Sequence, residues 1–183
     1  RSEKFCFLFI GRILKEKGIV ELMDATRYLK NGDKKFQVLM VGKLELDNVD
    51  QKFLFRFEEW ANEGLAKFVG FVDDVRDLIR SCDCVVLPSY REGVPRSLLE
   101  GAAIGRPLIA TNVPGCKEIV IDQRNGFICA PKSGEDLARK MSEMMKLSDT
   151  KRQSMGEFGR EYVEQKFDQG LVNDNYLQWV RKF

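Results

Sequence analysis

The feature that most constrains the fold is an alternation of short apolar runs with helical apolar spacing along the chain. The run from Phe5 to Ile10 (FCFLFI) is entirely apolar, as expected for a strand buried on both faces of a parallel sheet. Apolar residues then recur at helical spacing from Ile19 to Leu29, and this pattern ends at Asn31-Gly32. Such alternation is typical of a parallel sheet with crossover helices.

The same pattern predicts six strands, at residues 5–10, 36–41, 67–71, 84–87, 107–111 and 126–129. Helices are expected at 19–29, 49–63, just after Asp73-Asp74, 95–104, 137–145, near 151–166 and over the stripe from Val172 to Phe183. Six strands with crossover helices predict a Rossmann-like, doubly wound α/β sheet, whose ligands bind beyond the carboxyl ends of the strands. No linker or repeat interrupts the pattern, so residues 1–183 are interpreted as a single domain.

The sequence contains no histidine, which excludes a Ser/His/Asp triad, a Cys/His dyad and a His-ligated zinc site within it. Chemistry here must use carboxylates, Lys, Arg and backbone amides. The net charge of +2 gives no indication of nucleic-acid binding.

The five cysteines are odd in number, show no CxxC spacing, and are interpreted as reduced core thiols of a cytoplasmic protein. The sequence contains no apolar run of membrane-spanning length, and its first residues do not predict a signal peptide. Its first residue is Arg, so we expect it to be part of a longer protein.

The loop after the first strand carries two cations, Arg12 and Lys17, where a phosphate ligand of such a sheet would lie. An Arg offers a planar fork to phosphate oxygens and a Lys a mobile charge, so the pair can share a diphosphate. The loop is not GxGxxG, and Gly42-Lys43 is followed by Leu44, which excludes a P-loop there. The alternative is an ordinary solvated charged loop.

The stretch after the fourth strand predicts an anion site at a helix start. Pro95 suits a first helical position, and no Ser, Thr, Asp or Asn precedes it as a cap. The amides of Arg96, Ser97 and Leu98 are therefore expected to be free and to face the ligand edge of the sheet.

Two carboxylates flank this helix start, Glu92 in the loop before it and Glu100 within the helix. Carboxylates beside a phosphate site are unfavourable unless they accept hydrogen bonds from hydroxyls, which sugars supply. The pattern therefore favours an elongated ligand with a phosphate and sugar hydroxyls. The alternative is a salt-bridged surface helix.

At these residues the chain resembles the carboxyl-terminal, donor-binding domain of retaining glycosyltransferases of the GT-B fold, specifically the family four group. The resemblance extends from residue 5 to about residue 140. Five motifs carry it in order: Gly11-Arg12 with Lys17-Gly18, the E-x7-E spacing of Glu92 and Glu100, Gly105 to Thr111, Val113 to Val120, and Asn125-Gly126-Phe127. The departures are Gly101, where Ala is usual, and Pro114-Gly115 in place of Gly-Gly.

The resemblance implies roles for individual residues. Arg12 and Lys17 would bind the donor diphosphate and stabilise the leaving group, and Glu92 would contact hydroxyls of the donor sugar; these three are the catalytic candidates. Among the remaining substrate-binding candidates, the backbone at Val72 would lie beside the base and Glu100 would hold the ribose. The amides near Ser97 and Leu98 would contact the phosphates. Gly93 and Arg96, in the same stretch, complete the set.

The resemblance further implies retaining transfer of a hexose-type sugar to a glycan or lipid-linked acceptor, in polysaccharide biosynthesis. No DxD motif follows a strand, so neither a metal nor another cofactor is expected, and the cations and helix amides would replace a metal. The acceptor would bind to an amino-terminal domain that this chain lacks, so the chain alone is expected to be nearly inactive.

The expected location is the cytoplasm, with peripheral contact at the inner face of the membrane. Lys30, Lys34 and Lys35 are the candidates for such contact, although a small basic cluster is also typical of a solvated face. The stripe from Val172 to Phe183 either packs on this domain or crosses to the absent one.

Two other functions remain open at this point. A GT-B nucleotide-sugar epimerase shares the fold but not usually the Glu92 to Glu100 arrangement, and it would release epimerised sugar without an acceptor. A non-catalytic flavodoxin-like receiver or binding module is disfavoured, because Gly11-Arg12 stands where an acidic cluster would be expected.

Overall fold

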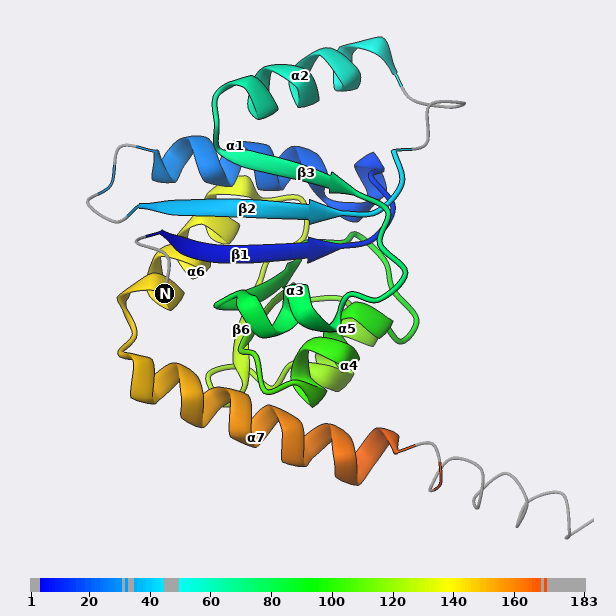
Figure 1. Cartoon of the computed structure of the whole chain (residues 1–183), viewed down its shortest axis with the longest axis vertical. Helices are drawn as coiled ribbons and strands as arrows, with labels where there is room; N and C mark the ends of the chain where they lie inside the picture. The colour runs from blue at the N-terminus through cyan, green and yellow to red at the C-terminus, as the bar shows by residue number, and fades with distance from the viewer. Residues whose placement is uncertain (1–3, 31, 33–34, 45–49, 169, 171–183) are drawn as a thin grey trace, which may run out of the picture.

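A computed structural model of the chain describes residues 4–30, 32, 35–44, 50–168 and 170. Six strands form one sheet in the order β3-β2-β1-β4-β5-β6, and every neighbouring pair is parallel (Figure 1). The strands are β1 (Phe5–Ile10), β2 (Phe36–Val41), β3 (Ala66–Gly70), β4 (Cys84–Leu87), β5 (Leu108–Thr111) and β6 (Gly126–Cys129). The predicted Rossmann-like sheet is confirmed, and its strand order reverses between β1 and β4.

Helices cover the sheet in two groups, as the doubly wound topology requires. One group joins α1 (Ile19–Leu29), α2 (Gln51–Asn62) and α6 (Gly134–Lys146), in which α1 contacts both others. The other joins α3 (Arg76–Ser81), α4 (Arg96–Ala103), α5 (Pro114–Ile119) and α7 (Asp149–Phe167), in which α4 contacts all three others. A short 3-10 helix, η1 (Lys15–Lys17), precedes α1.

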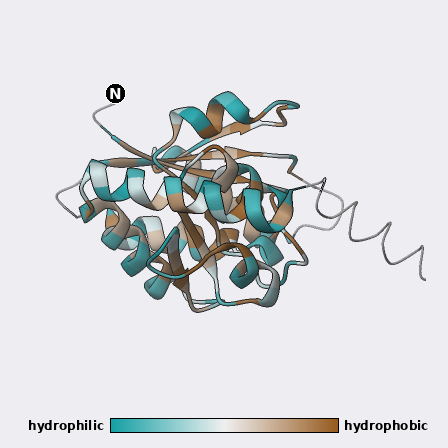
Figure 2. Cartoon of the chain, turned by 90° about the horizontal axis from the view of Figure 1, so that it is seen from below, coloured by the Kyte–Doolittle hydropathy of each residue, from teal (hydrophilic) through white to brown (hydrophobic). Residues whose placement is uncertain are grey.

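The core lies between these helices and the central strands. All residues of β4 and β5 are buried, which explains why both read as unbroken apolar runs. Figure 2 shows the apolar strands inside and the hydrophilic stretches on the outer helices. A polar contact inside the core is satisfied, because the indole of Trp60 donates to Thr26 Oγ1 at 2.7 Å.

Most expected elements are present, with ends shifted by one to three residues. The N-cap residue of α3 is Val75, which makes no side-chain cap hydrogen bond, so the expected acidic residue is not at the cap itself. Asp74, one residue before it, accepts from the amide of Arg76 at 3.0 Å. Helix α5 was not predicted, since Pro114 and Gly115 obscure so short a helical pattern. The expected helix from Val172 to Phe183, and Lys34 of the basic cluster, lie outside the described residues.

All five cysteines are buried and none forms a disulfide, as expected for core thiols. Within the residues that the structure describes, none of the helices has the length and apolar character needed to cross a bilayer.

Candidate functional site

The loops after β1 and β4 meet at the carboxyl edge of the sheet, where the strand order reverses. Gly18 ends η1 with φ of 73°, and a Cβ placed there would lie only 2.0 Å from the carbonyl oxygen of Pro88. A glycine is therefore required for both the left-handed conformation and the close approach. The amide of Tyr90 donates to the carbonyl oxygen of Glu16 at 2.9 Å and joins the two loops.

This junction brings together two of the three catalytic candidates. The Lys17 Nζ lies 2.6 Å from Glu92 Oε1, and the two side chains are only 22% and 11% exposed. Burial, followed by the negative charge of Glu92, raises the pKa of the nearby Cys116 thiol to about 12, so this thiol is neutral at physiological pH. Lys17 and Glu92 thus form a partly shielded ion pair, which is more persistent than an exposed one.

The loop that carries Glu92 is held from the far side by α5. A Cβ on Gly115 would lie 1.5 Å from the carbonyl oxygen of Gly93 and 2.8 Å from that of Glu92. The hydroxyl of Thr111, at the end of β5, donates to the carbonyl oxygen of Ser89. The position of Glu92 therefore depends on backbone contacts with both neighbouring loops.

The start of α4 is uncapped, as expected. Pro95 occupies the cap position in an extended conformation and offers no side-chain acceptor. The expectation of a free amide at Leu98 was wrong, because the first turn tightens and this amide donates to Pro95 O at 3.1 Å. In the described part of the chain, the amides of Arg96 and Ser97 have no acceptor. The anion site predicted at this helix start is thus reduced to two amides.

Arg96 and Glu100 lie on the outer surface of α4. The guanidinium of Arg96 is 3.8 Å from the Glu100 carboxylate, and the Arg96 side chain is 90% exposed. This long, exposed contact contributes little stability, so both side chains are available to a ligand.

A pocket of about 350 Å³ lies at the carboxyl ends of β1 and β2. Val72 is part of its wall, Arg12 also lines it, and the exposed ring of Phe71 stands at its side with Lys43 Nζ 5.1 Å from the ring centroid. Gly42, which lines the pocket, lets the loops after β1 and β2 approach closely, since a Cβ there would lie 1.8 Å from Gly11 O. An apolar wall beside cations suits a flat aromatic ring that carries phosphates.

Sequence reasoning missed three contributors to this region: Phe71, Lys43 and Gly115. Lys43 was considered only as part of a P-loop, and the spacing gave no sign that it lies beside Phe71. A glycine-lysine pair directly after a buried strand was the available signal, because it places a cation at the carboxyl edge.

The comparisons with known proteins identify the family of the chain and its fold. The model of the family "Glycosyl transferases group 1" matches residues 1–162. The chain belongs to this family. Its fold is therefore one half of the GT-B fold, and the described sheet is a Rossmann-like domain of a group 1 glycosyltransferase.

Two curated glycosyltransferases and one solved structure illustrate the similarity. The chain is 31% identical over 178 residues to N,N'-diacetylbacillosaminyl-diphospho-undecaprenol alpha-1,3-N-acetylgalactosaminyltransferase of Campylobacter jejuni, covering 97% of this chain and 44% of that protein. It is 28% identical over 172 residues to the capsular polysaccharide biosynthesis glycosyltransferase CapM of Staphylococcus aureus, covering 93% of this chain and 44% of that protein. The chain thus spans less than half the length of these relatives.

The solved structure is Anabaena Alr3699/HepE in complex with UDP and glucose. It superimposes with a TM-score of 0.87 at 23% identity, over 99% of this chain and 49% of that one. At this identity the likeness concerns the fold alone.

Proposed function

We propose that this chain is the nucleotide-sugar-binding half of a retaining, metal-independent glycosyltransferase that transfers a hexose-type sugar to a glycan or lipid-linked acceptor in polysaccharide biosynthesis. The observation that carries the proposal is the Lys17–Glu92 pair, which lies at the same carboxyl edge of the sheet as the pocket lined by Arg12. The curated relatives named above act on an undecaprenol-linked substrate or in capsular polysaccharide biosynthesis, which supports the acceptor class.

Arg12 and Lys17 bind the donor diphosphate in this proposal. Arg12 stands at the pocket and Lys17 at the loop junction, so a diphosphate between them receives a forked donor from one side and a point charge from the other. The amides of Arg96 and Ser97 add two fixed donors to the phosphate oxygens.

Binding of the diphosphate exchanges the partner of Lys17. Without a ligand, the ammonium of Lys17 is neutralised by Glu92 at 2.6 Å. A phosphate carries more negative charge than one carboxylate and competes for the ammonium. The Glu92 carboxylate then turns its acceptor oxygens to hydroxyls of the donor sugar, so the ion pair keeps the site organised until the donor arrives.

The nucleoside occupies the pocket at the carboxyl ends of β1 and β2. The base lies against Phe71 and the backbone at Val72, and the ribose hydroxyls donate to Glu100. UDP and glucose are bound in the similarly folded Anabaena structure, which supports a nucleotide sugar as the ligand.

Departure of the nucleoside diphosphate develops negative charge on the phosphate oxygens. Lys17, Arg12 and the two α4 amides are positioned to stabilise that charge before the reaction begins, and this supplies what a metal ion would otherwise supply. The donor phosphate itself takes the acceptor proton on the same face of the sugar, so retention needs no protein base in this half.

Titration calorimetry with uridine, guanosine and adenosine diphosphates tests the donor site. We expect one of the three to bind, and Arg12→Ala to weaken it by about tenfold or more, because a charge-assisted contact to phosphate contributes about 1.5–3 kcal/mol. Arg160→Ala is a matched control, since Arg160 lies on α7 in an exposed pair with Glu164. The proposal would be wrong if none of the three nucleotides bound, or if Arg12→Ala bound the nucleotide as tightly as the unchanged chain.

A further inference from the structure

A second pocket lies at the opposite edge of the sheet from the donor site. It has a volume of about 510 Å³ and is formed at the amino ends of β1 and β2, beside the turn that joins α3 to β4 (Figure 1). Its wall includes the cationic residues Lys4, Arg80 and Arg106, and Asp83 is the acidic residue among them. None of these residues belongs to the site described above.

Arg106 is held in this pocket by its backbone. Helix α4 ends with Gly105 at φ of 77°, where the Gly105 amide donates to Ala102 O at 2.8 Å and the Arg106 amide to Gly101 O at 2.9 Å. These two bonds are the Schellman pattern, which fixes the residue that follows the glycine. Helix α7 presses on the same turn, because a Cβ on Gly156 would lie 1.9 Å from Gly105 O.

The guanidinium of Arg106 has an unsatisfied donor. Its Nε is buried, and it has no hydrogen-bond acceptor among the described residues. A buried donor without an acceptor is unfavourable, so native proteins usually pair such atoms. An oxyanion with two oxygens would give Nε and a terminal nitrogen of the guanidinium acceptors at once, provided that the side chain turns its buried Nε toward the pocket.

The charges around Arg106 favour a negative ligand. Asp83 already accepts a hydrogen bond from the Cys6 amide at 2.8 Å, so part of its capacity is used. Arg80 pairs with Asp77 at 2.8 Å, but the two side chains are 59% and 94% exposed and such a pair contributes little. The three cations therefore outweigh the one carboxylate in the wall of the pocket.

Two thiols of the pocket add no negative charge. Burial raises the pKa of Cys6 to about 11 and that of Cys82 to about 12. Both thiols are therefore neutral at physiological pH, and they do not oppose an anion.

We propose that the pocket around Lys4, Arg80 and Arg106 binds a small anion that carries a phosphate group, at a site separate from the donor site. The guanidinium of Arg106 donates to two oxygens of the anion. Arg80 leaves its exposed pair with Asp77 to contact the anion, and Lys4 adds a further positive charge. The site uses none of the residues assigned to the donor, so either proposal stands if the other fails.

A residue-resolved NMR titration of the 15N-labelled chain with inorganic phosphate tests the site. We expect saturable shifts at the amides of Cys82, Asp83 and Arg106, which lie in this pocket. The amides of Arg96 and Ser97 report phosphate at the donor site separately. Absence of saturable shifts at the three pocket amides overturns the proposal.

Two variants and a control identify the residues that bind. Arg106→Gln should weaken phosphate binding at the pocket amides by about tenfold or more, since it removes a charged donor. Arg80→Gln, at an exposed side chain, should weaken it by a smaller factor and keeps the test open if Arg106→Gln fails to fold. Arg160→Gln on α7 should leave binding unchanged. Unchanged binding in both pocket variants overturns the proposal.

Two further arms distinguish the source of the phosphate. A soluble hexose phosphate that shifts the same amides indicates a free metabolite. Sedimentation with phosphatidylglycerol vesicles but not phosphatidylcholine vesicles, lost in Arg106→Gln, indicates a lipid headgroup. If neither the hexose phosphate shifts these amides nor the phosphatidylglycerol vesicles bind the chain, the proposal is overturned.

Discussion

At the residue scale, glycines determine how closely the loops of the donor site approach one another. Gly18, Gly42 and Gly115 each face a backbone carbonyl oxygen of another loop, at 2.0, 1.8 and 1.5 Å from an imagined Cβ. These contacts lie between loops that are distant in sequence. The spacing of Lys17 and Glu92 therefore depends on residues that carry no chemistry themselves.

Gly115→Ala should destabilise the chain by about 3 kcal/mol, since backbone atoms cannot move aside as a flexible side chain would. The imagined Cβ lies 1.5 Å from the Gly93 carbonyl oxygen. Gly93→Ala is the matched control for stability, because nothing lies within 4 Å of its imagined Cβ. Thermal unfolding of both variants checks the expectation, and equal unfolding temperatures would contradict it.

Tyr90→Phe should weaken nucleotide binding a few-fold and cost about 1 kcal/mol of stability, the usual value of one hydrogen bond. The Tyr90 hydroxyl donates to the Glu21 carboxylate, at 2.7 and 2.8 Å from its two oxygens, and so ties the Glu92 loop to α1. Burial, followed by the hydrogen bond to Glu21, raises the pKa of this phenol.

Tyr28→Phe is the control for this change, because it removes the same hydroxyl group from a tyrosine of α1 that is 65% exposed. Calorimetry and chemical denaturation of the two variants give both quantities. An equal effect of the two changes would show that the Glu21 contact does not position the loop.

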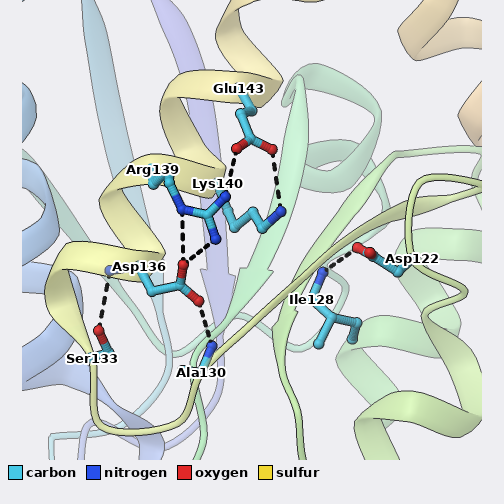
Figure 3. Close-up of polar contacts among 8 residues, drawn as sticks. All are labelled: Asp122, Ile128, Ala130, Ser133, Asp136, Arg139, Lys140 and Glu143. Carbon is cyan, nitrogen blue, oxygen red and sulfur yellow. Dashed lines mark hydrogen bonds and ion pairs between the residues drawn. The ribbon is translucent and has the colours of Figure 1, made fainter.

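At the element scale, the amino end of α6 shows how a helix is anchored to the end of β6. Ser133 accepts from the amide of Asp136 at 3.1 Å, as an N-cap does (Figure 3). Asp136 reaches back and accepts from the Ala130 amide at 2.7 Å, and it also contacts Arg139 (Figure 3). The carboxylate lies in the first turn, where the helix dipole favours it.

The stability that Asp136 contributes should be lost in acid. Burial acts to raise its pKa, but hydrogen bonds from the Ala130 amide and Arg139 outweigh burial and lower the pKa below the usual 3.8. A lowered folded pKa gives stability that is present above pH 3.8 and disappears as the pH falls through the folded value.

Asp136→Asn should therefore flatten the acid side of the stability curve and lower stability near neutral pH. Ser133→Ala is its counterpart, since it removes a cap that does not titrate and should cost about 1 kcal/mol at every pH. Urea unfolding between pH 2.5 and 7 separates the two. A parallel loss across this range in both variants would contradict the role of Asp136.

At the scale of the whole molecule, the chain is a Rossmann-like half of a GT-B fold and spans 44% of each curated relative described above. Its donor candidates lie at one edge of the sheet and the proposed phosphate pocket at the other. Helix α4 connects the two regions, because its first turn lies beside Glu92 and its last turn positions Arg106.

The isolated chain should bind a nucleoside diphosphate yet transfer almost no sugar. Acceptor contacts are expected in the other half of the enzyme, and without them the reacting groups lose their relative orientation. Calorimetry on the 183-residue chain, followed by a transfer assay with a nucleotide sugar and a lipid-linked acceptor, checks this. Substantial sugar transfer by the chain alone would contradict the expectation that the acceptor contacts lie in the other half of the enzyme.

Much of the architecture was predictable from the sequence. Apolar runs identified β1, β2 and β4, because strands buried on both faces contain few polar residues, whereas β3 is mostly exposed and was found by its short apolar pattern. The order of motifs also placed Arg12, Lys17 and Glu92 on adjacent loops, since parallel strands bring their carboxyl ends to one edge.

Other features could not be predicted from local patterns. Gly101 was noted only as a departure from the usual Ala, whereas an imagined Cβ there lies 2.9 Å from Val85 Cγ2, so this glycine allows close packing of α4 on β4. The amide of Leu98 was expected to be free but is used by a tightened first turn. Both outcomes depend on how a helix is seated against its neighbours.

By itself, the sequence determined the fold class, the absence of histidine chemistry and the identity of the charged candidates, because periodicity and residue type are local properties. Only the tertiary structure decided that Lys17 pairs with Glu92 across 75 residues and that Phe71 and Lys43 flank the pocket beside Val72. It also decided that the Nε of Arg106 is buried with no acceptor in the part of the chain that the structure describes. Contacts of this kind arise from close packing between distant segments, and no local pattern encodes their distances.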